Sequence, residues 1–217
     1  MTAMTTEGAT VAARHQIINQ QVRTWDVLDA AVLAAQERVA RECFVPAALK
    51  HVAYADAPIP LGDGQHLWPA KLDGRVLQAL KLKAHESVLE IGTGSGYLSA
   101  CLAQLGARVV SLEINPRLAN SARQQLSSQC IQHVSVLNQD VLTYSPRERY
   151  DAIIFTAAVE TVPAPVLSWL NPNGRLIAPV GQARQTMTLY HRGLPPAALF
   201  ETAVDALIQP ASKHFVF

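Results

Sequence analysis

A glycine-rich segment is the first place where this sequence could do chemistry. Gly92-Thr93-Gly94-Ser95-Gly96 follows a short apolar run and precedes a helical pattern. Such a turn lets backbone N–H groups and the start of a helix approach a nucleotide-like ligand, and glycine removes the Cβ that would hinder a sharp turn. The spacing is G-x-G-x-G, because Tyr97 occupies the position of the third glycine in a dinucleotide fingerprint, and there is no P-loop motif. Nicotinamide dinucleotides and nucleoside triphosphates are therefore disfavoured.

Three acidic residues stand at or just after the ends of predicted strands. Glu90 precedes the glycine loop, where a carboxylate can face a cationic amino group directly or through water. Glu113 follows the first glycine by about 20 residues, the spacing at which an acid accepts two ribose hydroxyls, and Asp140 could accept the exocyclic amine of an adenine. No Lys or Arg in the loop could meet a phosphate. The set predicts S-adenosyl-L-methionine, with S-adenosyl-L-homocysteine as product, although each residue alone could also be an ordinary turn, strand end or loop cap.

The elements that must position these residues alternate along the chain. Helical patterns separate or follow short β-branched, apolar runs of the kind that form buried parallel strands. The predicted strands are 87–92, 107–114, 133–140, 150–158 and 174–181, and the helices are 97–105, 116–128 and 162–170. Residues 186–192, with ALIQP (206–210) and HFVF (214–217), are expected to close the sheet edge. This order predicts an α/β fold with a doubly wound, mostly parallel seven-stranded sheet.

A helical extension precedes this sheet. Residues 17–45 have apolar residues at helical spacing, with Asp26 as a candidate N-cap, and residues 72–82 show a further helix. Between them, residues 55–71 are rich in proline and glycine, so neither a regular helix nor a central strand is expected there. We therefore divide the chain into a flexible N-terminus (1–16), helices and a substrate loop packed on the core (17–82), and a Rossmann-like cofactor-binding domain (83–217), forming one compact unit.

Composition narrows the class of partner. The chain has 217 residues, 49% of them hydrophobic and 16% charged, with a formal net charge of +1. These values disfavour disorder and an electrostatic nucleic-acid or membrane surface, so partners must be recognised by a shaped pocket. Cys43, Cys101 and Cys130 are widely spaced and odd in number, which favours reduced thiols. With no signal-peptide pattern, no long apolar run and no metal-ligand spacing among the histidines, the sequence predicts a cytoplasmic protein without a metal.

Several segments together resemble one enzyme family. They are RECFVP (41–46), AYADAPIPLGDGQ (53–65), VLEIGTGSGYLSACLA (88–103), YDAIIFTAA (150–158) and LNPNGRLIAPVG (170–181). In order and spacing they resemble the protein-L-isoaspartate O-methyltransferase family over about residues 20–181. The resemblance implies a methyltransferase fold and transfer of a methyl group to the side-chain carboxylate of an isoaspartyl residue in damaged protein, giving a methyl ester.

The resemblance also places the acceptor. It implies that the loop from Ile59 to Trp68, including Gln65 and Leu67, forms the wall over the substrate, and that Thr156 and Ala157 contribute backbone groups. Members of the family usually continue Gly-Gln with Thr-Ile-Ser, whereas this chain has His66-Leu67-Trp68. An indole takes up room that an extended peptide would need but offers a face for a planar acceptor. His66 is a candidate general base for a hydroxyl acceptor.

These substitutions leave three readings open. The chain could be an isoaspartyl methyltransferase, a paralogue acting on a small planar or hydroxylated acceptor, or a non-catalytic cofactor-binding module whose acceptor loop is plugged by Trp68. Trp68 could equally pack in the core, and His66 could be an exposed loop residue without a role. The sequence does not indicate an oligomeric state.

Overall fold

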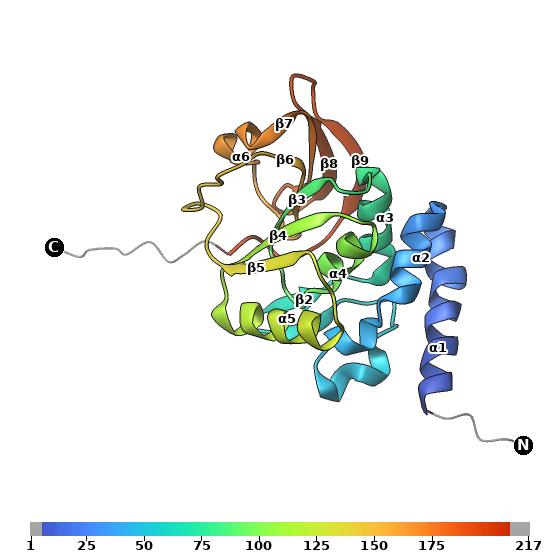
Figure 1. Cartoon of the computed structure of the whole chain (residues 1–217). Helices are drawn as coiled ribbons and strands as arrows, with labels where there is room; N and C mark the ends of the chain where they lie inside the picture. The colour runs from blue at the N-terminus through green and yellow to red at the C-terminus, as the bar shows by residue number, and fades with distance from the viewer. Residues whose placement is uncertain (1–5, 209–217) are drawn as a thin grey trace, which may run out of the picture.

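A seven-stranded sheet forms the centre of the structure, a computed structural model that describes residues 6–208 (Figure 1). Its strand order is β5-β4-β3-β6-β7-β8-β9. The strands are β3 (Ser87–Ile91), β4 (Arg108–Glu113), β5 (Val134–Asn138), β6 (Tyr150–Phe155), β7 (Leu170–Val180), β8 (Gln185–His191) and β9 (Ala197–Thr202). The pairings from β5 to β7 are parallel, and β8 and β9 are added antiparallel. The predicted mostly parallel α/β fold is confirmed.

Successive residues of the central strands point to opposite faces of the sheet, as the pleat requires. Val88 and Ile154 belong to one buried cluster, whereas Leu89 and Ile153 belong to another. Residues of α3 (Ala70–Leu80), α4 (Tyr97–Gln104) and α5 (Pro116–Ser128) contribute to the first cluster, and α6 (Ala164–Ser168) contributes to the second. Both faces of the sheet are therefore covered, which explains why its strands read as continuous apolar runs.

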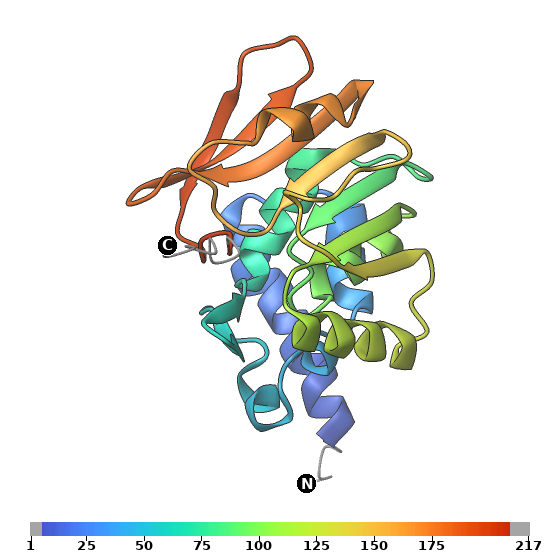
Figure 2. The ribbon, with the colours of Figure 1, turned by 90° about the vertical axis from the view of Figure 1, so that its left-hand side faces the viewer.

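The N-terminal helices pack beside α3 at one side of the sheet (Figures 1 and 2). They are α1 (Thr6–Ile17) and α2 (Ala30–Arg38), joined by a π-helical turn (Ile18–Val22) and a 3-10 turn (Arg23–Trp25). Two further 3-10 turns (Arg41–Phe44 and Ala47–Val52) lead to a hairpin of β1 (Ile59–Gly62) and β2 (Gln65–Leu67). Because this region shares its apolar cluster with the sheet, the hairpin is held against the core.

The structure corrects the expectations for the N-terminal region. Residues 6–17 form α1, where a flexible segment was expected; Arg14 fixes its end through Glu42 (2.7 Å) and the Tyr54 hydroxyl (2.9 Å). The predicted helix from 17 to 45 is broken into turns and α2. Its N-cap is Asp29, whose carboxylate accepts from two backbone N–H groups, whereas Asp26 has a left-handed conformation (φ 61°) that ends the preceding turn.

The C-terminal region also differs from expectation. The edge strand is β9, formed by residues 197–202, whereas residues 206–208 of the predicted ALIQP strand make only an isolated bridge at Ala206. HFVF lies outside the described residues. The helix expected at 162–170 is reduced to α6, because Pro163 starts it and β7 already begins at Leu170. No helix in the described part of the chain is long and apolar enough to span a membrane.

Candidate cofactor and acceptor site

A pocket opens at the carboxyl ends of β3, β4 and β6, where ligands bind in open α/β sheets. The glycine loop, the β1–β2 hairpin and the segment that follows β9 complete its wall. The sequence-predicted residues that line it are Gln65, His66, Leu67, Trp68, Glu90, Gly92, Thr93, Gly94, Ser95, Glu113, Asp140, Thr156 and Ala157. Folding therefore brings the predicted cofactor and acceptor residues to one cavity, while their individual roles remain predictions.

Close packing of the glycine loop explains its first glycine. Gly92 has φ 98°, and a Cβ there would lie 2.2 Å from Oγ1 of Thr156. That hydroxyl donates to the Gly92 carbonyl at 2.6 Å and ties the end of β6 to the loop. Gly92 is thus required both for a backbone conformation that L-residues rarely adopt and for the approach of the Thr156 side chain. The Thr156 hydroxyl and its backbone N–H also both donate to the Ile91 carbonyl, at 3.1 and 3.0 Å, so the end of β6 is tied to β3 as well.

Two predicted contact residues do not line the pocket. Gly96 starts α4 with φ 87°, and a Cβ there would meet Ala122 at 3.3 Å, so this glycine allows α4 and α5 to pack closely. Ile59 is buried in the core and pairs with Leu67 across the hairpin. Both residues therefore contact neighbouring elements of the structure and do not face the pocket.

Glu90 combines full burial with an unpartnered oxygen. Its Oε2 accepts from the hydroxyls of Ser99 and Ser111, the latter at 2.5 Å, but its Oε1 has no hydrogen-bond partner among the described residues. Burial raises the pKa of Glu90 to about 7, against the lowering effect of the two hydroxyls. An orphaned carboxylate oxygen at a pocket wall is costly unless a donor reaches it, so the geometry fits a cationic amino group of a ligand.

Glu113 and Asp140 stand at neighbouring strand ends. The two carboxylate oxygens of Glu113 each accept one backbone N–H, from Gly94 (2.8 Å) and Asn115 (2.9 Å), and burial raises its pKa. Each oxygen keeps a further lone pair, which fits the two hydroxyls of a ribose. Asp140 uses one oxygen to accept the N–H of Leu142 and is half-buried at the pocket edge. These contacts orient both carboxylates before any ligand arrives.

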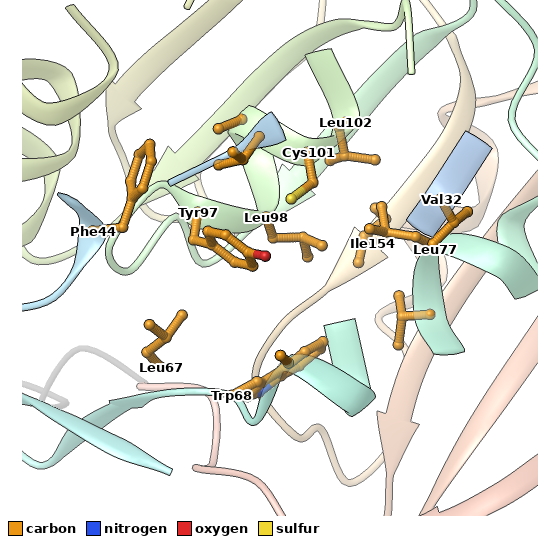
Figure 3. Packing of buried hydrophobic residues seen from close by; sticks show 14 of the residues in the cluster. Val32, Phe44, Leu67, Trp68, Leu77, Tyr97, Leu98, Cys101, Leu102 and Ile154 are labelled. Atoms are coloured by element: carbon orange, nitrogen blue, oxygen red, sulfur yellow. The ribbon is translucent and has the colours of Figure 1, made fainter. Parts of the chain in front are cut away.

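Trp68 belongs both to the core and to the pocket wall. Its side chain is only 6% exposed, and Figure 3 shows it in the same apolar cluster as Leu67, Tyr97 and Leu98. The guanidinium of Arg41 donates to its backbone carbonyl. The tryptophan is therefore fixed at both its backbone and its ring, and it forms part of a packed wall.

A buried ion pair supports this wall from beneath. Arg41 Nη1 lies 2.8 Å from Oδ2 of Asp73, and its Nε donates to the carbonyl of Ala53. The guanidinium also stacks 4.6 Å from the ring centroid of Tyr97. Burial raises the pKa of Asp73 to about 7, although Arg41 acts in the opposite direction. Asp73 lines the pocket, so the RECFVP segment holds the acceptor side in place through an ion pair that the sequence pattern did not reveal.

His66 meets a residue far away in the sequence. Its Nδ1 lies 3.1 Å from both carboxylate oxygens of Asp205, and its backbone N–H donates to Oδ2 at 2.7 Å. Asp205 was missed by sequence reasoning because it lies 139 residues away, outside the family-like segments. Leu207 and Ile208 of the same segment also line the pocket. Within residues 6–208, no group of three or more His, Cys, Asp or Glu could hold a metal ion.

The sheet, the glycine loop and the carboxylates at successive strand ends define the class: the chain has the fold of S-adenosylmethionine-dependent methyltransferases. The family model of protein-L-isoaspartate(D-aspartate) O-methyltransferase matches residues 12–206. The chain therefore belongs to the protein-L-isoaspartate O-methyltransferase family, as its sequence segments indicated.

Individual relatives agree with this assignment. The chain is 41% identical over 169 residues to a protein-L-isoaspartate O-methyltransferase of Methanoculleus marisnigri, covering 77% of each chain. It is 38% identical over 206 residues to that of Picosynechococcus sp., covering 94% of this chain and 92% of the relative. A crystal structure of a Plasmodium falciparum protein assigned to this activity, in complex with S-adenosyl-L-homocysteine, has a TM-score of 0.80 at 19% identity and covers 90% of this chain and 98% of that one. That structure supports the fold.

Proposed function

We propose that this protein is an S-adenosylmethionine-dependent carboxyl O-methyltransferase that forms a methyl ester on isoaspartyl residues of damaged proteins or peptides. The observation that carries the proposal is the family match from residue 12 to residue 206, which includes both the cofactor loop and the acceptor hairpin. The pocket supports it, because residues of both segments line the same cavity.

Three carboxylates would hold the cofactor. Glu113 would accept the ribose hydroxyls, Asp140 the adenine amine, and the free Oε1 of Glu90 the cationic amino group. When bound, S-adenosylmethionine supplies a methyl group on a positively charged sulfur. The chain's own contribution is orientation, since the backbone N–H groups of Gly94 and Asn115 already fix the Glu113 carboxylate.

The acceptor side needs placement and exclusion of water. An isoaspartyl carboxylate is anionic at neutral pH, so its oxygen can receive a methyl group without losing a proton. The β1–β2 hairpin, braced by Arg41 beneath Trp68, would form the wall against which the acceptor lies. Packing of Trp68 in the core supports a wall and argues against a mobile plug.

A peptide pair tests the proposal. Two peptides that differ only in isoaspartate or aspartate are incubated with methyl-labelled S-adenosylmethionine, and base-labile methanol is counted. The proposal expects label on the isoaspartyl peptide alone. Glu113→Ala should abolish it by removing the ribose acceptor, while Glu160→Ala, an exposed glutamate that does not line the pocket, is the matched control.

Other results would support other functions. Turnover of small hydroxylated acceptors without turnover of peptides would indicate a paralogue, and cofactor binding without any turnover would indicate a binding module. We also keep a cytoplasmic location as a prediction, supported by three cysteines that form no disulfide. The absence of a nucleic-acid partner likewise stays a prediction from the near-neutral charge.

A further inference from the structure

The pair of His66 and Asp205 lies where two hollows of the surface meet. Both residues line the cofactor pocket and also an adjoining hollow, as does Trp68. The adjoining hollow is otherwise lined by Pro58, Pro69, Ala203 and Val204. The side chains of His66 and Asp205 are 39% and 30% exposed, so a bound molecule can reach them. The pair therefore stands between the cofactor pocket and a neighbouring space open to an acceptor.

Asp205 is held in place by its neighbours. Its backbone carbonyl accepts from the N–H of Ala158 at 2.7 Å, and the Leu207 N–H donates to the Ala158 carbonyl at 2.8 Å. The preceding residue, Val204, makes two hydrogen bonds with the side-chain amide of Gln185. The carboxylate is thus anchored to β8 and to the segment after β6, and it in turn fixes the imidazole of His66 on β2.

This contact determines which atom of His66 is available. A carboxylate only accepts hydrogen bonds, so Nδ1 of His66 carries the proton that faces Asp205. The available ring atom is Nε2, which is a lone-pair acceptor in the neutral ring and a donor in the imidazolium. Asp205 supplies the counter-charge of the imidazolium.

The charged residues of the two hollows indicate which ligand Nε2 of His66 can bind. No Lys or Arg is among the described residues that line either hollow, and His66 is the one basic side chain among them. Five acidic residues line the two hollows: Asp205 from the segment after β9, Asp73 from α3, Glu90 from β3, Glu113 from β4 and Asp140 from the loop after β5. Asp73 already has Arg41 as its partner. Among the residues that the structure describes, an anionic acceptor therefore has one cation to meet at these hollows, which is protonated His66.

We propose that His66, held by Asp205, is the specificity-determining residue of this chain, donating from Nε2 to the isoaspartyl carboxylate so that its other oxygen faces the methyl donor. This inference rests on the proposed function. Methylation of the carboxylate releases no proton, so His66 acts here as a positioning donor and not as a base. The substitution of the usual Thr-Ile-Ser segment by His66-Leu67-Trp68 then replaces a neutral hydroxyl donor by a charged one.

A variant can separate this role from a structural one. In His66→Asn the side-chain amide takes the place of Nδ1 and can still donate to Asp205, but nothing remains at the position of Nε2. The matched control is His15→Asn, because His15 Nδ1 on α1 lies 3.1 Å from the carboxylate of Glu37 on α2, in an exposed pair that lines neither hollow. Since exposed ion pairs contribute little to stability, neither variant should unfold.

The experiment measures kcat and KM for an isoaspartyl peptide, the affinity of that peptide for the full chain loaded with S-adenosylhomocysteine, and Tm. For His66→Asn we expect KM to rise by about 10- to 100-fold, the effect of losing one hydrogen bond to a charged group, with Tm and S-adenosylhomocysteine affinity unchanged. His15→Asn should behave as the wild type.

Each outcome has a distinct meaning. Ester formation with equal KM in His66→Asn and wild type overturns the inference and leaves the proposed function intact. Peptide affinity that depends on His66 without any ester supports the contact and refutes the proposed function. Methylation of a hydroxylated acceptor that requires His66 would overturn the donor role in favour of a base.

Discussion

Glu90 offers a test in which pH separates the cost of a buried charge from the benefit of ligand binding. The carboxyl is fully buried, and its pKa is raised from an ordinary 4.5 to about 7 in the folded protein. Between these two pKa values, the Glu90 carboxyl keeps its proton in the folded state but has lost it in the unfolded state. Stability of the unliganded protein should fall as the pH rises from the unfolded pKa to the folded pKa.

The size of this effect follows from the interval between the two pKa values. At about 1.4 kcal/mol per pH unit, Glu90 should remove about 3 kcal/mol of unfolding free energy between about pH 4.5 and pH 8. Glu90→Gln has no proton to lose, so the difference in stability between Glu90→Gln and wild type should shift by this amount over that range, in favour of the variant at high pH. Taking the difference removes the contributions of titrating groups that do not interact with Glu90; Asp73 and Glu113, whose charges also raise the pKa of Glu90, cancel only in part.

Urea unfolding at several pH values, without cofactor, measures the difference. A stability difference between Glu90→Gln and wild type that stays constant from low to high pH would refute the argument from burial. Titration calorimetry then measures the affinity for S-adenosylhomocysteine. Glu90→Gln should bind this ligand about 10- to 100-fold more weakly than the wild type at pH 8, because the amide offers no negative charge to the amino group. Unchanged affinity would exclude Glu90 Oε1 as the amino-group partner.

Three other substitutions test the walls of the pocket. Gly92→Ala should lower the free energy of unfolding by about 2–4 kcal/mol, because of backbone strain and the clash with Thr156. Urea unfolding of the double variant with Thr156→Ala should show a smaller loss of stability than the sum of the losses in the two single variants. Trp68→Ser should lower the free energy of unfolding by about 3–5 kcal/mol, and Tm should fall by about 2–4 °C for each kcal/mol lost. An unchanged Tm would show that the indole is not part of the core. Arg41→Met should cost about 3–5 kcal/mol by leaving Asp73 without a partner, and adding Asp73→Asn should recover most of it in the same assay.

The fold and the cofactor end of the pocket could be predicted from local sequence patterns. The strand from Ser87 to Ile91 is a buried apolar run that ends in a glycine loop, and Glu113 and Asp140 come at the ends of the next two strands. Parallel strands place their carboxyl ends at one sheet edge, so residues that follow consecutive strands must gather there. The repeat of strand and helix is thus enough to assemble this half of the site.

Local patterns were less informative where the backbone is irregular. The N-cap at Asp29 and the short α6 depend on how turns and prolines divide the helices, and the edge strand β9 is recognised by its pairing with β8. Such boundaries respond to tertiary contacts more than to propensity.

The acceptor side was decided by contacts between residues far apart in the chain. Asp205 reaches His66 because the antiparallel strands β8 and β9 return the chain to the hairpin, and Arg41 meets Asp73 because the N-terminal turns pack on α3. No periodicity or spacing encodes these pairings, since they arise from how whole elements pack. The sequence by itself determined the fold, the family and the position of three carboxylates at the ends of strands. The tertiary structure alone decided that Oε1 of Glu90 has no hydrogen-bond partner among the described residues and that His66 is oriented by a carboxylate.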